Sequence, residues 1–116
     1  MLIQLLMIKI KTFLITFFLI FNYCYILPTD AFNLEKGKTL FIKNCIACHK
    51  NGTNVIIPEK NLKQLTLEAN GIYSKDAIIY EILNGKNGMP AFGGRLKEEE
   101  IETIATYIID AASREF

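Results

Sequence analysis

The chain has 116 residues, 51% of them hydrophobic, and its thirteen Lys and Arg nearly balance twelve Asp and Glu, for a formal net charge of +1. This length excludes a large multidomain enzyme, and the near-neutral charge gives no reason to expect a nucleic-acid partner. The hydrophobic residues are unevenly spread, because 22 of the first 31 residues are apolar, against 37 of the remaining 85. We therefore expect a targeting segment followed by one small domain.

The N-terminal segment has the order of a secretory signal. Two lysines precede an uncharged apolar run over residues 13–27, and small and polar residues follow it up to Ala31. We predict cleavage after Ala31, so that residues 1–31 are a signal peptide and residues 32–116 form a single domain. A retained membrane anchor is the alternative, although a run of about 15 apolar residues is shorter than the ~20 that span a bilayer.

Residues 32–116 show helical periodicity and no strand-like alternation, which predicts an all-α fold. We expect four short helices, over residues 34–44 with an Asn33 cap, 62–69 with an Asn61 cap, 75–83 with a Ser74 cap, and a last helix bearing the stripe Ile101, Ile104, Ala105, Ile108 and Ala112. Gly37 predicts a close contact with that last helix. Long loops join these helices, so the core needs a large apolar group at its centre.

Cys45, Cys48 and His49 form a C-x-x-C-H motif, the attachment signature of c-type haem. On a helix, residues three and four apart share one face, so both thiols and the imidazole can reach one porphyrin. The thiols would add to the vinyl groups as thioethers, and His49 would ligate the iron while its other ring nitrogen donates to a carbonyl or a water. We expect that acceptor within residues 54–58.

Three other uses of this motif compete with haem. A thioredoxin-type redox pair normally lies near a βαβ pattern, which this helical sequence lacks. A structural disulfide suits an exported chain, but it would close a very small loop and leave His49 without a role. A structural zinc site needs four ligands, and only Cys45, Cys48 and His49 remain after signal cleavage.

Met89 is the candidate for the second axial ligand of the iron. It is the only methionine after residue 31, and it lies in a glycine-rich loop before Pro90, where it fits a fixed site better than a packed helix face. A core methionine that fills a gap is the alternative interpretation. A lysine ligand or an empty sixth position also stays open, and an empty position would suit a haem peroxidase or gas sensor.

The mature segment resembles the cytochrome c6 family, the photosynthetic class I c-type cytochromes of algae and cyanobacteria. The resemblance rests on residues 44–49 (NCIACH), 54–60 (NVIIPEK), 67–71 (LEANG) and, above all, 84–96 (NGKNGMPAFGGRL). It implies a class I cytochrome c fold around one covalently attached haem c, with thioethers at Cys45 and Cys48 and axial ligands at His49 and Met89. It also implies that Arg95 lies near the haem edge and takes part in docking.

The same resemblance implies a soluble, monomeric one-electron carrier rather than an enzyme. Its donor would be cytochrome f of the cytochrome b6-f complex, and its acceptor would be photosystem I. The expected location is the thylakoid lumen of an algal plastid, or the lumen or periplasm of a cyanobacterium. A periplasmic respiratory mono-haem carrier shares the same chemistry and remains the alternative. The sequence departs from the family at Lys97, where a Ser or Thr often caps the last helix.

Overall fold

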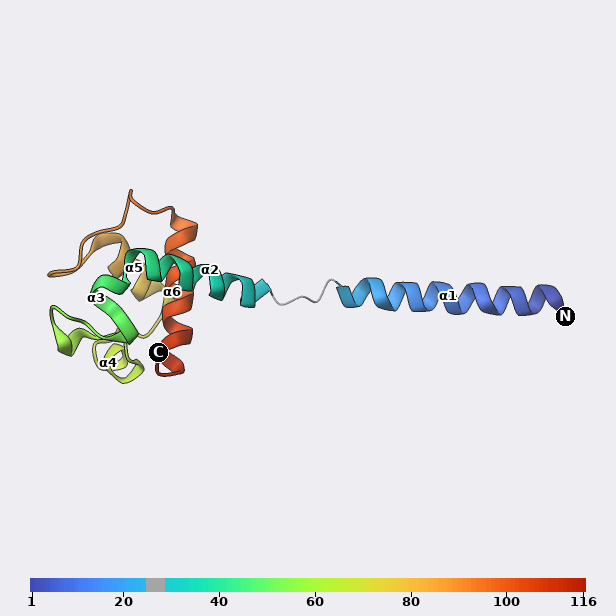
Figure 1. The fold of residues 1–116 in the computed structure, drawn as a ribbon, viewed down its shortest axis with the longest axis horizontal. Helices are drawn as coiled ribbons and strands as arrows, with labels where there is room; N and C mark the ends of the chain where they lie inside the picture. The colour runs from blue at the N-terminus through green and yellow to red at the C-terminus, as the bar shows by residue number, and fades with distance from the viewer. Residues whose placement is uncertain (25–28) are drawn as a thin grey trace.

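The structure, a computed structural model, describes residues 1–24 and 29–116. Its helices are α1 (Leu2–Cys24), α2 (Thr29–Asn44), α3 (Ile46–His49), α4 (Gln64–Ala69), α5 (Lys75–Asn84) and α6 (Glu98–Ser113), with the 3-10 turns η1 (Lys50–Gly52) and η2 (Pro58–Lys60) (Figure 1). Within the described ranges there is no strand, only the isolated bridges Lys86–Met89 and Gly93–Leu96. The expected all-α fold is confirmed.

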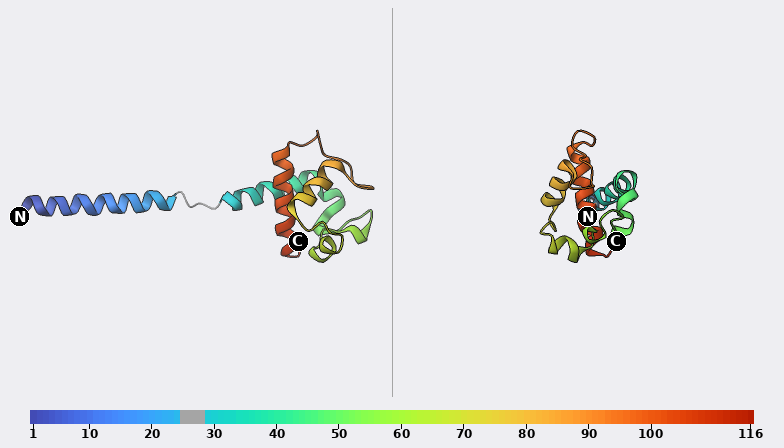
Figure 2. Two further views of the ribbon diagram at one scale, coloured as in Figure 1. Left: turned by 180° about the vertical axis from the view of Figure 1, so that it is seen from behind. Right: turned by 90° about the vertical axis from the view of Figure 1, so that its left-hand side faces the viewer.

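The first helix, α1, extends away from the other helices in Figure 1 and in the left view of Figure 2. Residues 2–23 have a mean hydropathy of 2.0 and are not buried, so the helix is long and apolar enough to cross a membrane. A signal sequence near the N-terminus passes the same test. The end of the expected apolar run, residues 25–27, lies outside the described residues. Because α1 has 23 residues, the length of the run no longer argues against an anchor.

Helices α2 and α6 cross at Gly37, as the sequence predicts. Gly37 is buried, and a Cβ atom at this position would lie 2.5 Å from the Thr103 carbonyl oxygen and 2.7 Å from the Tyr107 Cβ. Neither neighbour is the far end of a flexible chain, so the two backbones approach closely only because residue 37 has no side chain. This crossing fixes where α2 ends and the C-x-x-C-H turn begins.

The core lies between α6 and the shorter helices. Ile101, Ile104 and Ala105 of α6 are fully buried, and Leu67 of α4 is 1% exposed. Helix α5 adds further apolar side chains to the same cluster. The predicted stripe of α6 lies at the centre of this core. The fifth member of that stripe, Ala112, is buried at the far end of the helix.

The starts of two helices differ from expectation. Helix α2 begins at Thr29, so Asn33 lies inside the helix and is not its cap; the sequence from Thr29 to Lys36 contains no Gly or Pro that would stop the helix. Helix α4 begins at Gln64 because the Asn61 Oδ1 accepts the Lys63 N–H at 3.1 Å, which makes a local turn instead of a cap.

The start of α5 follows the prediction. The Ser74 hydroxyl oxygen accepts the Ala77 N–H at 3.2 Å, and the Ser74 backbone is extended, as an N-cap residue requires. The helix ends at Asn84, and Gly85 then takes a positive φ of 69°. This turn directs the chain into the loop that carries Met89.

Candidate functional site

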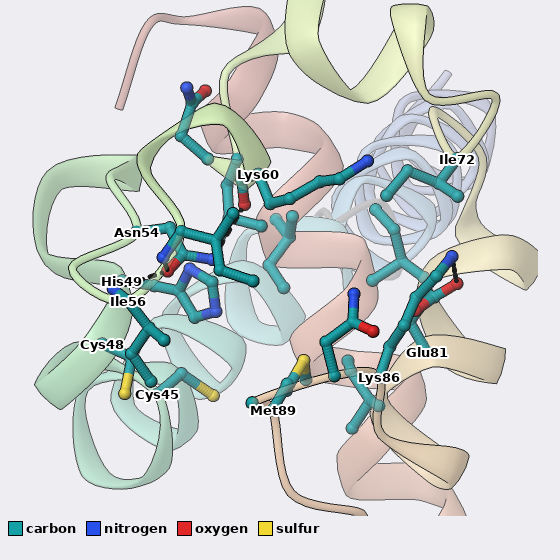
Figure 3. Close-up of a pocket in the computed structure, with 18 of the residues that line it drawn as sticks. Cys45, Cys48, His49, Asn54, Ile56, Lys60, Ile72, Glu81, Lys86 and Met89 are labelled. Atoms are coloured by element: carbon teal, nitrogen blue, oxygen red, sulfur yellow. Dashed lines mark hydrogen bonds and ion pairs between the residues drawn. The ribbon is translucent and has the colours of Figure 1, made fainter.

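The C-x-x-C-H motif forms one tight turn after α2. Cys45 stands at the bend, and its carbonyl oxygen accepts the N–H groups of Cys48 at 3.2 Å and His49 at 2.9 Å. This single turn is α3, and it places the side chains of all three residues on one cavity (Figure 3). The spacing of three and four residues therefore predicts that these side chains meet at one site. Cys45 itself lies at the N-cap position, one residue before α3.

His49 is oriented by a hydrogen bond to the backbone. Its Nδ1 atom lies 2.9 Å from the Thr53 carbonyl oxygen, and because a carbonyl only accepts, Nδ1 carries the proton and Nε2 keeps a free lone pair. Burial lowers the pKa of His49, and the bond to Thr53 partly opposes this effect. A neutral imidazole with a free Nε2 is the form that binds a metal ion.

The acceptor for His49 was expected within residues 54–58, and that prediction is wrong by one residue. The chain reverses through Asn51, with a φ of 50°, and Gly52, with a φ of 69°, and this left-handed turn brings the Thr53 carbonyl back to the imidazole. Asn54 has another role: its Oδ1 accepts the N–H groups of Ile56 and Ile57.

Cys45 and Cys48 are free thiols at the cavity. Burial, and to a smaller extent the neighbouring Cys48, raises the pKa of the Cys45 thiol to about 11. At neutral pH this thiol is therefore protonated, whereas a redox-active cysteine of the thioredoxin type needs a lowered pKa. Nor does either cysteine pair in a disulfide, so neither the redox pair nor the structural disulfide is favoured by this geometry.

Met89 reaches the same cavity from the loop after α5. Lys86 and Met89 exchange two backbone hydrogen bonds, Lys86 N to Met89 O at 3.1 Å and Met89 N to Lys86 O at 2.9 Å. The loop is also tied to α5 by the Phe92 N–H, which donates to the Ile82 carbonyl at 2.9 Å. Figure 3 shows Met89 on a separate segment from His49 and the two cysteines, across the cavity from them.

The cavity has about 1240 Å³ of empty space, its open mouth included. Its interior is lined by apolar side chains, among them Phe41, Leu67, Ile78, Ile82, Phe92 and Ile108. Lys60 and Asn70 contact each other at its edge, and Lys86 pairs with Glu81 at 2.8 Å. These two polar pairs were not predicted, because they join different segments and no spacing in the sequence indicates them.

A haem fits this arrangement. Two thiols and an imidazole nitrogen stand on one wall, a thioether sulfur stands on the other, and the space between them is large and apolar. Zinc fits less well, because no group of three or more His, Cys, Asp and Glu among the described residues could hold a metal ion. The four predicted cofactor residues, Cys45, Cys48, His49 and Met89, are thus brought together.

Arg95 lies beside the cavity but does not line it. Its guanidinium carbon stands 5.1 Å from the centre of the Phe92 ring, and Phe92 is itself a wall of the cavity. Arg95 is exposed to solvent, so its charge is available to a partner close to the haem site.

Comparison with known proteins places this geometry in a family. Residues 32–108 match the family described as "Cytochrome C oxidase, cbb3-type, subunit III". Cytochrome c6 of Porphyra purpurea is 45% identical over 107 residues, which cover 90% of this chain and 97% of that protein. Cytochrome c6 of Bumilleriopsis filiformis is 50% identical over 82 residues, covering 71% and 95%. The chain belongs to the cytochrome c6 family.

The structure of cytochrome c6 from the diatom Phaeodactylum tricornutum agrees with this assignment. It superposes with a TM-score of 0.70 at 42% identity, over 72% of this chain and 98% of that one. Membership in the cytochrome c6 family confirms the class I cytochrome c fold and the covalently bound c-type haem. The chain is an electron-transfer haem protein.

Proposed function

We propose that His49 and Met89 are the two axial ligands of the haem iron and that Cys45 and Cys48 are its thioether attachment points. The observation that carries this proposal is the meeting of an oriented, neutral imidazole and a loop-held thioether across one apolar cavity. When bound, the haem supplies a reversible one-electron change between Fe(II) and Fe(III). The protein contributes ligands, excludes water from the cavity and leaves no position for a substrate, so it performs no bond-making reaction.

We further propose that the chain carries electrons from cytochrome f of the cytochrome b6-f complex to photosystem I, in the thylakoid lumen. The similarity to cytochrome c6 of algae supports this role. Residues 1–31 act as a signal peptide that is removed, which leaves a soluble monomer of residues 32–116. Exposed Arg95, held on Phe92, supplies a positive charge for docking beside the cavity.

Flash kinetics with photosystem I test this role. The mature holoprotein is expected to reduce flash-oxidised photosystem I at a rate that rises with its concentration and falls with added salt, because charged surfaces steer weak encounters. Arg95→Gln should slow this reaction and leave the reduction potential unchanged, whereas the control Lys75→Gln, on α5, should change neither. No reduction of photosystem I by the wild type would refute the proposed acceptor.

A periplasmic respiratory carrier is the second candidate. The match to the family described as a subunit of cytochrome oxidase favours it. The same holoprotein should then be oxidised rapidly by a terminal oxidase and slowly by photosystem I. The faster of these two oxidation reactions, compared at equal ionic strength, decides between the two functions.

A further inference from the structure

Three aromatic rings form a cluster next to the C-x-x-C-H turn. The ring centres of Phe41 and Tyr107 are 5.3 Å apart, and Phe116 lies 6.0 Å from Phe41 and 6.4 Å from Tyr107. Phe41 is 3% exposed and lines the haem cavity. The Phe116 ring is therefore packed against a wall of the functional site, although no sequence motif includes it.

Phe116 also covers the loop that follows His49. A Cβ atom at Gly52 would lie 2.5 Å from the Phe116 Cδ2 and 2.7 Å from its Cγ, so the ring rests directly on the Gly52 backbone. Gly52 is buried, and its carbonyl oxygen accepts the Leu62 N–H at 2.7 Å. The backbone of this residue is thus held from two sides, by a ring and by a hydrogen bond.

The position of Phe116 is set by α6. Its N–H donates to the Ala111 carbonyl oxygen at 2.8 Å, which closes the chain back onto the end of that helix. Because α6 packs closely against α2 at Gly37, the ring is attached to a helix that is itself held by close packing. Contacts therefore run without interruption from α6 through Phe116 to Gly52.

Gly52 immediately precedes Thr53, whose carbonyl oxygen accepts the His49 ring N–H. We propose that Phe116 is a positioning residue for His49: by pressing on Gly52, its ring holds the Thr53 carbonyl at hydrogen-bonding distance from Nδ1. This proposal rests on the proposed role of His49 as an iron ligand. A firmly held acceptor fixes the plane of the imidazole and increases its basicity toward the metal.

Hydrogen exchange at the His49 ring tests the proposal. In reduced, ¹⁵N-labelled holoprotein, Phe116→Ala should accelerate exchange of the His49 Nδ1 proton about tenfold, the equivalent of ~1.4 kcal/mol for the lost ring contacts. Phe116→Tyr, which keeps the ring, should restore the wild-type rate. The reduction potential of Phe116→Ala should rise. A weaker hydrogen bond from His49 Nδ1 to the Thr53 carbonyl makes the imidazole less basic and less able to stabilise Fe(III).

Ile101→Val is the matched control, because it trims a fully buried side chain of α6 and leaves the loop of His49 untouched. Equal acceleration in Phe116→Ala and this control, or none in either, would overturn the proposal. If Phe116→Ala yields no holoprotein, Phe116→Leu serves instead: faster exchange supports the proposal, and an unchanged rate overturns it. Wild-type His49 signals without the ring-current shift of an imidazole under a porphyrin would refute the ligand assignment itself, and with it the proposal.

Discussion

At the level of single residues, the proposed ligand Met89 is held by its loop and not by a helix. Gly85 allows the loop to fold tightly, because a Cβ there would lie 2.6 Å from the Met89 carbonyl oxygen. The two backbone hydrogen bonds between Lys86 and Met89 then fix the turn. Such a loop places Met89 on the cavity, where its side chain is also packed, partly buried, against the core cluster.

We predict that Met89→Ala lowers the reduction potential, because a thioether ligand stabilises Fe(II) and its loss removes that preference. The variant should also bind carbon monoxide when reduced, whereas the wild type should not. Potentiometric titration and absorbance spectra measure both effects. Gly88→Ala is the control, since it disturbs the same loop, where a Cβ would meet Ile56 at 3.3 Å, but keeps the sulfur. Carbon monoxide binding by the wild type would instead support a gas sensor or peroxidase.

The residues of the site differ in how far the sequence predicts them. Cys45, Cys48 and His49 lie three and four positions apart, so one helical turn is enough to bring them together. Met89 was predictable from its loop composition and from a family resemblance. Thr53 was not, because its contact with His49 depends on the left-handed turn before it, which a sequence pattern does not specify.

At the level of elements, the crossing of α2 and α6 depends on Gly37. We predict that Gly37→Ala destabilises the holoprotein by about 2 kcal/mol, because the new methyl group meets backbone at 2.5 Å and overpacking outweighs the gain in helix propensity of about 1 kcal/mol. Lys38→Ala, at an exposed position of the same helix, should leave stability unchanged. Chemical denaturation measures both, and equal stability of Gly37→Ala and the wild type would show that the helices can separate without cost.

The start of α6 lacks a side-chain cap at Lys97 but has a compensating bond. The Glu100 Oε2 accepts the Lys97 backbone N–H at 2.9 Å. The second hydrogen bond of a capping box, from the Glu100 backbone N–H to the side chain of residue 97, cannot form because a lysine side chain has no acceptor. Lys97→Ser should complete the pair and raise stability by about 1 kcal/mol, measured as a shift in the denaturation midpoint. Lys97→Ala provides the comparison; if it stabilises the protein equally, the gain does not come from capping.

The elements themselves were predictable where a local signal controls them. Helix α5 begins after Ser74 as expected and ends one residue later than expected, before Gly85, because a capping hydroxyl and a positive φ act within a few residues. Helix α4 was predicted two residues too long, since Asn61 can accept a bond in a turn as readily as in a cap. The start of α2 was missed for a different reason. Residues 29–32 contain no Gly or Pro that would stop a helix, so the helix extends back to Thr29.

At the level of the whole molecule, the domain is built around a space. Core residues from α2, α4, α5 and α6 line the cavity, namely Phe41, Leu67, Ile78, Ile82 and Ile108. These side chains are buried in the core, and a bound haem would add apolar contacts to all of them at once. Burial of one large apolar side chain is worth about 1.5–3 kcal/mol, so contacts of this kind are large beside the ~5–15 kcal/mol that keeps a small domain folded.

We therefore predict that Cys45→Ala/Cys48→Ala, expressed without attached haem, has less helix than the holoprotein, binds a hydrophobic dye and melts without a cooperative transition. Far-UV circular dichroism, dye fluorescence and thermal scans measure these properties. Adding free haem to the double variant provides the control, because His49 and Met89 remain and the filled cavity should recover part of the helix content. A haem-free double variant with full helicity and a sharp transition would mean that the helices pack without their central group.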